Sequence, residues 1–225
     1  MGALVIATLL DFDGVLVDSE PVHLAAFNDV LTRHGLSITE QEYTARYLSL
    51  DDASVFRAVL ARGGRTLRED EVRLLVAAKA PKFMERFEGA FRVFPGAVDL
   101  IARRAERGPV GIVSGALEGE IEFALKKMGA RDKIALIVSA EKTLASKPDP
   151  ASFLLAVSEL RRLGHRGSAV AVEDSIGGVT AAKGASLRCV AVSHSYPPED
   201  LRRAGADAVV ANLAALTDAL LEDAT

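Results

Sequence analysis

Short runs of apolar residues recur along the chain, and within them polar and apolar positions do not alternate. Runs of this kind are typical of strands that are buried on both faces of a sheet. They span residues 3–10, 110–113, 134–138, 169–172, 188–192 and 208–210. From the second run onward they alternate with helical segments that each end beside a glycine, over residues 117–128, 151–163 and 176–183. This order predicts right-handed crossovers and a parallel sheet that is covered by helices.

One connection is much longer than a crossover requires. About a hundred residues separate the first predicted strand from the second, whereas a crossover needs roughly a dozen. The intervening segment has no convincing strand pattern, and it contains helix-start patterns: Ser19 with Pro21, Thr39 with Glu42, and Thr66 with Glu69. Pro81 lies inside the last periodic stretch and should kink or split that helix.

We therefore predict an α/β fold with two parts. Residues 1–14 and 92–225 form a Rossmann-like core around the parallel sheet, and residues 15–91 form an inserted α-helical domain. The connections near residues 15–18 and 91–95 are the expected hinges between the two parts.

Composition and charge narrow the range of functions. The chain has 225 residues, 49% of them hydrophobic, and 27 Lys and Arg against 31 Asp and Glu. A net charge of -4 offers no basic field for phosphates, so we expect no nucleic-acid partner. The first apolar run stops at Asp11, short of the roughly 20 residues of a membrane span, and it lacks a signal-peptide pattern. Because the single cysteine, Cys189, has an apolar setting, we expect a cytoplasmic protein with no membrane partner, either a monomer or a weak homo-oligomer.

Polar residues follow each of the first four predicted strands. Each of them, taken alone, has an ordinary explanation as a turn, a helix cap or a solvated side chain. They are Asp11 and Asp13, then Ser114 and Gly115, then Lys147, and finally Glu173 and Asp174. Open α/β sheets, however, bind ligands at the carboxyl ends of their strands. The shared position of these residues therefore favours one joint site.

The chemistry of such a site follows from its charges. Four carboxylates at one sheet edge repel one another, and a hard cation with oxygen ligands, best of all Mg²⁺, resolves that repulsion. The cation, Lys147, the Ser114 hydroxyl and the backbone N–H groups at Gly115 would together bind an anion. With a carboxylate as the nucleophile, the predicted reaction is phosphoryl transfer through an aspartyl-phosphate.

In these motifs, their order and the place of the insertion, the sequence resembles the haloacid dehalogenase (HAD) superfamily. It is most similar to the phosphoglycolate phosphatase-like and β-phosphoglucomutase-like members, which carry a helical cap after the first strand. The resemblance implies that Asp11 is the nucleophile and Asp13 the general acid/base. It also implies that Ser114 and Lys147 bind the phosphoryl oxygens. The dehalogenases proper lack the second aspartate of the first motif, so Asp13 argues against carbon–halogen cleavage.

The same resemblance implies a metal site. Asp174 would bind Mg²⁺ together with the Asp11 carboxylate and the Asp13 backbone carbonyl. Glu173 would be a further acidic member of that site. Mg²⁺ is the cofactor that we expect.

Within the insertion, the resemblance points to substrate contacts by Ser19, His23 and Lys79. Lys79 lies in a Lys-x-x-x-aromatic pattern with Phe83. A capping or packing role for His23 and a solvated position for Lys79 are the competing interpretations. We interpret the other histidines as surface or structural residues: His34, His165 and His194.

The leading hypothesis is a magnesium-dependent phosphatase that acts on a small phosphorylated metabolite, such as a sugar phosphate. The alternative is a β-phosphoglucomutase-like mutase, which must hold a second phosphate with cations of the cap. Residues 47–52 contain no Lys or Arg at the place where those mutases have them, although Arg46 or Lys79 would supply one charge. Asp51 and Asp52 are interpreted as first-turn acids of the next helix. A signalling receiver domain is about half this length, and a degenerate phosphate-binding protein would not keep every motif residue.

Overall fold

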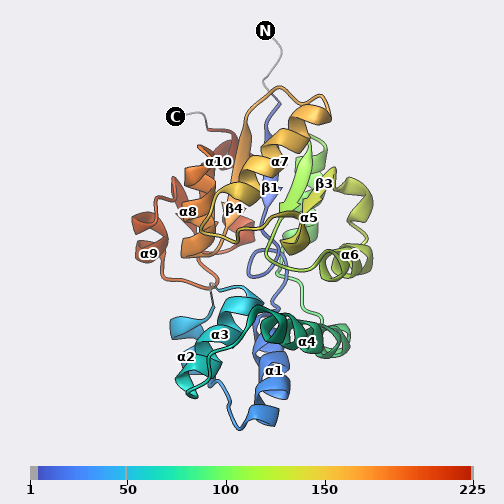
Figure 1. The fold of residues 1–225 in the computed structure, drawn as a ribbon. Coiled ribbons are helices and arrows are strands. Elements are labelled where there is room, and N and C mark those ends of the chain that lie inside the picture. The colour runs from blue at the N-terminus through green and yellow to red at the C-terminus, as the bar shows by residue number, and fades with distance from the viewer. Residues whose placement is uncertain (1–4, 49, 224–225) are drawn as a thin grey trace. The chain divides into compact units, whose positions relative to one another are not determined.

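The computed structural model describes residues 5–48 and 50–223, which group into two compact units (Figure 1). The first unit contains the described residues up to Asp18 together with those from Val93 onward. The second unit is the continuous segment Ser19–Arg92, from which residue 49 of the predicted cap loop is missing among the described residues. The first boundary lies later than residue 14 because Val15, Leu16 and Val17 are fully buried and group with the first unit.

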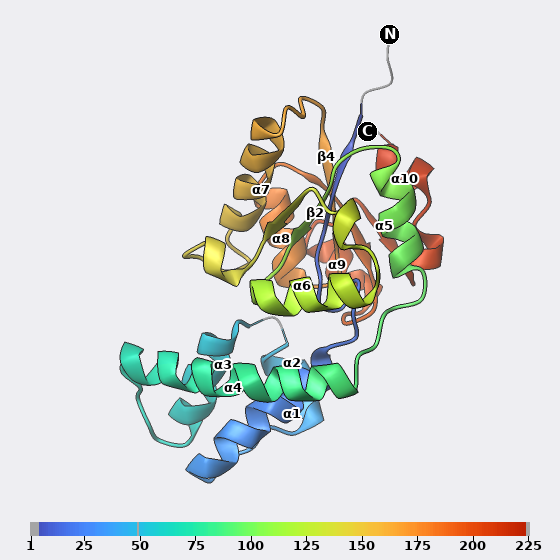
Figure 2. The same cartoon turned by 90° about the vertical axis from the view of Figure 1, so that its right-hand side faces the viewer.

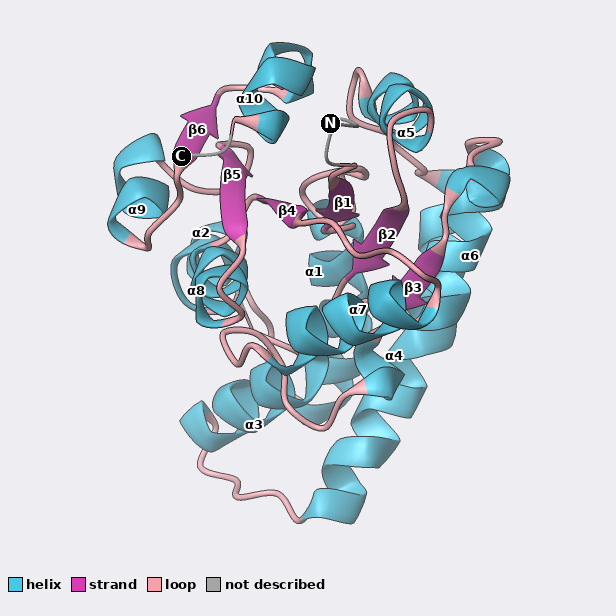
Figure 3. Ribbon diagram, turned by 90° about the horizontal axis from the view of Figure 1, so that it is seen from above, coloured by secondary structure: helices cyan, strands magenta, loops and turns pink. Residues whose placement is uncertain are grey.

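The first unit is built on a six-stranded parallel sheet in the order β3-β2-β1-β4-β5-β6 (Figure 3). The strands are β1 Ala7–Leu10, β2 Val110–Val113, β3 Leu136–Val138, β4 Ala169–Glu173, β5 Arg188–Val192 and β6 Ala208–Val210. Leu10 aligns with Ile112 of β2 and with Val172 of β4, so these three strands end at one edge. The predicted α/β fold is confirmed. Residues 3–4 of the first predicted run lie outside the described residues.

Helices cover both faces of this sheet. They are α5 Ala97–Ala105, α6 Glu118–Lys127, α7 Ala151–Arg162, α8 Ile176–Gly184, α9 Pro198–Arg203 and α10 Asp218–Glu222, with 3-10 turns at Arg131–Lys133, Ala140–Lys142 and Leu213–Ala215. α7 and α8 lie on one face, and α5 and α10 lie on the other (Figure 2, Figure 3). The buried residues Phe153, Ala156 and Leu160 recur at helical spacing and pack α7 onto the strands. Within the described part of the chain, no helix is long and apolar enough to cross a membrane.

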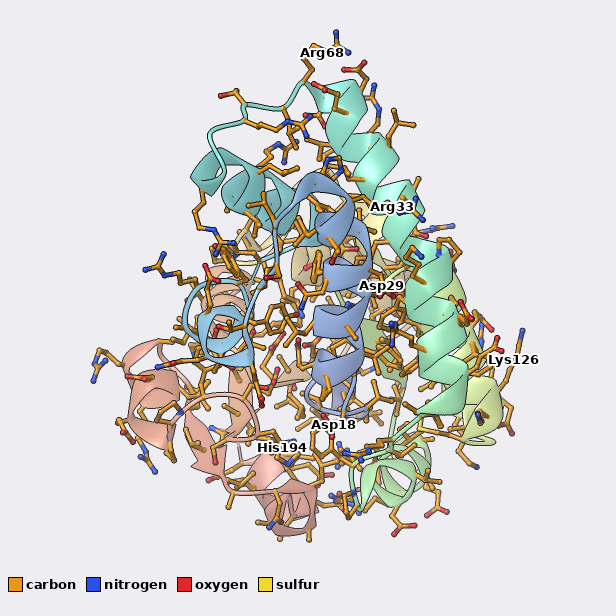
Figure 4. All side chains as sticks on the ribbon, turned by 90° about the horizontal axis from the view of Figure 1, so that it is seen from below. Asp18, Asp29, Arg33, Arg68, Lys126 and His194 are labelled. Atoms are coloured by element: carbon orange, nitrogen blue, oxygen red, sulfur yellow. The ribbon has the colours of Figure 1, made fainter. Side chains whose placement is uncertain are left out.

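The second unit is helical in its described residues. It consists of α1 Glu20–Leu31, α2 Glu40–Arg46, α3 Asp52–Arg62 and α4 Glu69–Gly89, with a 3-10 turn at Thr32–His34. Its core includes Phe27 and Phe56, whose rings meet edge to face with centroids 5.3 Å apart. Asp29, labelled on α1 in Figure 4, accepts a hydrogen bond from Nε of Arg86 on α4 at 2.7 Å. The expectation that Pro81 splits a helix is wrong, because α4 runs through it.

Local hydrogen bonds decide where two of these helices begin. The Thr39 hydroxyl accepts from the Glu42 N–H at 3.2 Å, as the spacing predicts. The corresponding prediction for Thr66 is wrong. The cap residue of α4 is Arg68, whose N–H donates to the Glu71 carboxylate at 3.0 Å. An acid placed three residues after Arg68 therefore sets the start of this helix.

The two chain connections that lead to and from the helical unit are tied together inside the first unit. Val17 and Val93 form an isolated antiparallel bridge. Beside it, the Phe94 N–H donates to the Leu16 carbonyl at 2.9 Å. The Gly14 N–H donates to the Val17 carbonyl, also at 2.9 Å. The chain thus leaves and re-enters the first unit at adjacent points.

Candidate active site

The candidate site lies at the carboxyl edge of the sheet. Asp11 directly follows β1, Ser114 directly follows β2, and Glu173 ends β4 with Asp174 next to it. These four residues are buried. Lys147 lies in the segment between β3 and α7, and its side chain is 14% exposed. The strands therefore bring the predicted residues of the core together, as their positions at strand ends require.

Lys147 joins the acidic parts of this site. Its ammonium lies 3.0 Å from Oδ1 of Asp11 and 2.5 Å from Oε1 of Glu173. It also donates to the Val113 carbonyl at 2.8 Å. The ring centroid of Phe153, on α7, lies 5.2 Å from Nζ, within the range of a cation–π contact. Three acceptors and a ring thus fix the position of this cation without a substrate.

Burial and the crowding of acids change the proton affinities in the site. Burial, followed by the charge of Glu173, raises the pKa of Asp11 to about 7, although Lys147 acts in the opposite direction. For Lys147, burial lowers the pKa, but the charges of Asp11 and Glu173 outweigh burial and raise it. Lys147 therefore stays charged, while the carboxylates share too little positive charge. A further cation would return Asp11 to its charged form.

The donor set fits a magnesium ion. Asp11, Glu173 and Asp174 each offer a carboxylate oxygen, and these oxygens all lie within 4.8 Å of one another. Oxygen donors of this kind suit Mg²⁺. Three buried carboxylates beside the single ammonium of Lys147 also leave an excess of negative charge, which a divalent cation would balance. Glu173 additionally accepts from the Asp174 N–H at 3.2 Å and from the Ser175 hydroxyl at 3.3 Å.

Asp174 is confined by two neighbouring loops. Gly14 has a φ of +75°, and a Cβ at this position would lie 1.9 Å from Oδ2 of Asp174. Only glycine meets both the backbone and the space requirement there. From the loop after β5, the Ser195 hydroxyl donates to the same Oδ2. Sequence reasoning missed Ser195, although the strand-end rule that found the other residues also applies to β5.

Ser114 and Gly115 form the turn after β2. The Ser114 hydroxyl accepts from the Ala116 N–H at 3.1 Å. A helix-capping role for Ser114 is wrong, because α6 begins only at Glu118. Among the described residues beyond its immediate neighbours, no heavy atom lies within 4 Å of a Cβ built at Gly115. The turn therefore has open space beside its backbone.

The helical unit holds a buried polar group of its own. The Lys79 ammonium lies 2.5 Å from Oδ1 of Asp52 and 2.8 Å from Nδ1 of His23. The His23 ring stacks on Phe83, with centroids 4.2 Å apart. Lys79 is 1% exposed, so the competing interpretation of a solvated lysine is wrong. Ser19 is fully buried directly before α1.

A family model described as haloacid dehalogenase-like hydrolase matches residues 8–192. The chain belongs to this family. Protein CbbY of Cereibacter sphaeroides is 31% identical over 220 residues, 93% of each chain. Hexitol phosphatase B of Escherichia coli (strain K12) is 30% identical over 222 residues, 95% of each chain. The crystal structure of β-phosphoglucomutase from Clostridium difficile has a TM-score of 0.82 and 21% identity, covering 96% of this chain and 94% of that one, a likeness that shows the fold alone.

Family membership confirms the predicted type of enzyme, a HAD-type phosphoric monoester hydrolase. The matched segment contains every core residue that the sequence predicts for the site, from Asp11 to Asp174. It ends at Val192, before the loop that carries His194 and Ser195. The contacts of that loop are therefore a feature of this chain that family matching does not describe.

Proposed function

We propose that this protein is a magnesium-dependent phosphatase that hydrolyses a small phosphorylated metabolite through an aspartyl-phosphate on Asp11. One observation carries the proposal. Lys147 bridges Asp11 and Glu173 beside the Asp174 carboxylate, at the edge where Ser114 also leaves the sheet. A buried nucleophile, a fixed cation and a hydroxyl at one sheet edge are the parts that phosphoryl transfer requires.

Hydrolysis would proceed in two steps. A carboxylate oxygen of Asp11 attacks phosphorus, the ester P–O bond breaks, and Asp13 gives its proton to the leaving alkoxide. Asp13 then accepts a proton from water as the water oxygen attacks the phosphoryl group. The acyl-phosphate bond breaks, which releases inorganic phosphate and restores the Asp11 carboxylate. Lys147 and Ser114 hold phosphoryl oxygens in both steps.

Magnesium would be held by the carboxylates of Asp11 and Asp174 and by the Asp13 backbone carbonyl, with Glu173 as a further acidic neighbour. It supplies positive charge beside the phosphoryl group. The excess of carboxylates over cations in the site supports this assignment.

The helical unit would act as a cap that selects the substrate and admits water at one step only. Ser19, His23 and Lys79 are the residues that we assign to substrate contact. Lys79 supports this role, because a cation that is buried and paired with Asp52 is costly to place in a small helical unit without a function. The cytoplasmic location, the monomeric or weakly oligomeric state and the absence of nucleic-acid and membrane partners stay predictions from the sequence.

Hydrolysis is favoured over mutase activity by the charge of the helical unit. Residues 47–52 contain no Lys or Arg. Lys79 is paired with Asp52, and Asp51 caps α3 by accepting from the Ser54 N–H at 2.7 Å. This balance supports a substrate with one phosphate, since a second phosphate needs uncompensated cations.

A screen of phosphorylated metabolites for phosphate release, with and without Mg²⁺, tests the proposal. We expect release from sugar phosphates or similar monoesters only with Mg²⁺, and no release by Asp11→Asn, which is nearly isosteric. Asp99→Asn, which changes an exposed acid on α5, is the matched control and should keep full activity. Turnover by Asp11→Asn or in excess chelator would contradict the assignment, and rapid formation of glucose 6-phosphate from β-glucose 1-phosphate would favour a mutase.

A further inference from the structure

The loop that follows β5 contacts two parts of the candidate site. Figure 4 labels His194 on this loop, and Ser195 is the next residue. Ser193, directly before them, turns the other way, because its N–H and hydroxyl donate to the Val210 carbonyl after β6 at 2.9 and 3.3 Å. Adjacent residues of one loop thus have separate partners. This separation provides a matched control for any role of the pair.

Ser195 acts on the carboxylate of Asp174. Its hydroxyl donates to Oδ2 of Asp174, the oxygen that faces Gly14. A Cβ at Gly14 would lie 3.0 Å from the Ser195 hydroxyl oxygen, so glycine, carboxylate and hydroxyl form one closely packed group. The hydroxyl has a single proton, and donating it to Oδ2 fixes how the carboxylate is rotated.

His194 acts on the peptide that follows Asp13. Its Nδ1 lies 2.8 Å from the Gly14 carbonyl oxygen. A carbonyl oxygen only accepts, so Nδ1 carries the proton. The other face of the contact is Phe94, in the connection that returns from the helical unit, whose ring stacks on His194 with centroids 4.0 Å apart. His194 therefore links the loop that carries Asp13 to the returning connection.

We propose that His194 and Ser195 are positioning residues of the hydrolase site: Ser195 orients the Asp174 carboxylate for the metal, and His194 fixes the Gly14 peptide that follows Asp13. The inference deepens the proposed function and rests on it for the role of His194. Neither residue touches the reacting atoms. Groups that orient a metal ligand are expected to change metal affinity, and groups that hold a catalytic loop are expected to change kcat.

The test of Ser195 is a calorimetric titration of the full chain with MgCl₂, without substrate. We expect Ser195→Ala to weaken Mg²⁺ binding about 10- to 100-fold. Ser195→Thr keeps the hydroxyl and should restore most of the affinity, and Ser193→Ala should bind Mg²⁺ as the unchanged protein does. Ser195→Cys replaces Ser195→Ala if the latter fails to fold. Equal Mg²⁺ affinity in the unchanged protein and in the variant without the hydroxyl overturns the role of Ser195.

The test of His194 compares two variants that each keep one of its contacts. His194→Phe keeps a ring against Phe94 and loses the N–H donor, and we expect kcat to fall about tenfold with little change in KM. His194→Asn keeps an N–H at the place of Nδ1 and should retain most of kcat. His165→Phe is the control, because His165 contacts the Ser168 carbonyl away from the site. A kcat for His194→Phe equal to that of the unchanged protein, or a loss as large in His194→Asn, overturns the role of the hydrogen bond.

The two proposals fail in distinguishable ways. A protein that hydrolyses no phosphate ester, with intact Mg²⁺ binding, would refute the proposed function while the Mg²⁺ titration still decides the role of Ser195. A protein that hydrolyses phosphate esters and loses neither Mg²⁺ affinity in Ser195→Ala nor kcat in His194→Phe would refute the positioning roles alone.

Discussion

Two lysines are buried in this protein, one in each unit, and their surroundings differ in charge. Lys147 has Asp11 and Glu173 as partners, with Asp174 close to both acids, and it lies over the Phe153 ring. Lys79 has the single carboxylate of Asp52 as its printed acidic partner, with His23 beside it, and its ammonium lies 4.2 Å from the Phe27 ring centroid. Both lysines combine a carboxylate with an aromatic ring.

The difference lies in the balance between acids and cations. Around Lys147 the acids are in excess, and the raised pKa of Asp11 is the sign of that excess. Around Lys79 one ammonium meets one carboxylate, which leaves no net charge. An excess of buried carboxylate calls for a metal ion, whereas a balanced pair recognises neutral polar groups and repels neither sign strongly. The same residue type thus belongs to an ion-binding centre in one unit and to a neutral polar group in the other.

Loss of Lys147 should have the largest effect on this comparison. Lys147→Met keeps much of the side-chain length and removes the charge, so we expect kcat to fall about 10³-fold, because the fixed charge that stabilises the transition state is lost. Lys142→Met is the control, since Lys142 pairs with the exposed Glu118 at 2.9 Å. Steady-state phosphate release measures both variants. A loss of kcat below about tenfold would show that the metal alone supplies the charge.

Loss of the acid in the helical unit should destabilise the protein. Asp52→Asn leaves Lys79 buried without its carboxylate, and we expect the free energy of unfolding to fall by about 2 kcal/mol. Urea denaturation of the full chain measures the change. The double variant Lys79→Met with Asp52→Asn should recover part of the loss, because no unpaired charge remains. Equal stability of Asp52→Asn and the unchanged protein would show that solvent already compensates Lys79.

Loss of Lys79 should affect substrate binding more than chemistry. If the helical unit contacts the substrate as proposed, Lys79→Met should raise KM about tenfold and leave kcat within a few-fold. Lys82→Met, on the same helix, serves as the control. A large fall in kcat with an unchanged KM would instead place Lys79 among the groups that act in the transition state.

Loss of an acid in the core should have the opposite sign to loss of Asp52, and it is the smallest effect. The pKa of Asp11 is raised to about 7 in the folded protein without metal, chiefly by burial. The folded state therefore holds a proton that the unfolded chain releases, so the contribution of Asp11 to stability falls as the pH rises from about 4 to 7. In chelator at pH 8, Asp11→Asn should raise the free energy of unfolding by on the order of 1 kcal/mol. Saturating Mg²⁺ should cancel or reverse that gain, and a gain that persists with Mg²⁺ would argue against a metal beside Asp11.

Much of the core was predictable because it depends on local pattern and one rule of topology. The unbroken apolar runs at β2, β5 and β6 fix those strands, since residues buried on both faces of a sheet cannot be polar. Asp11, Ser114, Glu173 and Asp174 follow from the position of strand ends. Lys147 was accessible because it lies in the same group of loops.

Contacts between distant segments were not predictable in this way. Asp52 has the pattern of a first-turn acid, and nothing local marks its pairing with Lys79 on another helix. The bond from Ser195 to Asp174 likewise depends on how two loops pack. The start of α4 was misplaced because two nearby residues, Thr66 and Arg68, each have an acid three positions later, and pattern alone does not rank them.

The tied connections also have an evolutionary consequence. Because Val17 bridges Val93 and Phe94 bonds to Leu16, the chain that departs for the helical segment returns to the sheet-bearing unit beside its point of departure. Any insertion whose ends lie close together fits between these two points without disturbing the strands. The segment Ser19–Arg92 is thus an exchangeable module, and a lineage of such enzymes can acquire new substrates by replacing this module while inheriting the hydrolytic machinery intact.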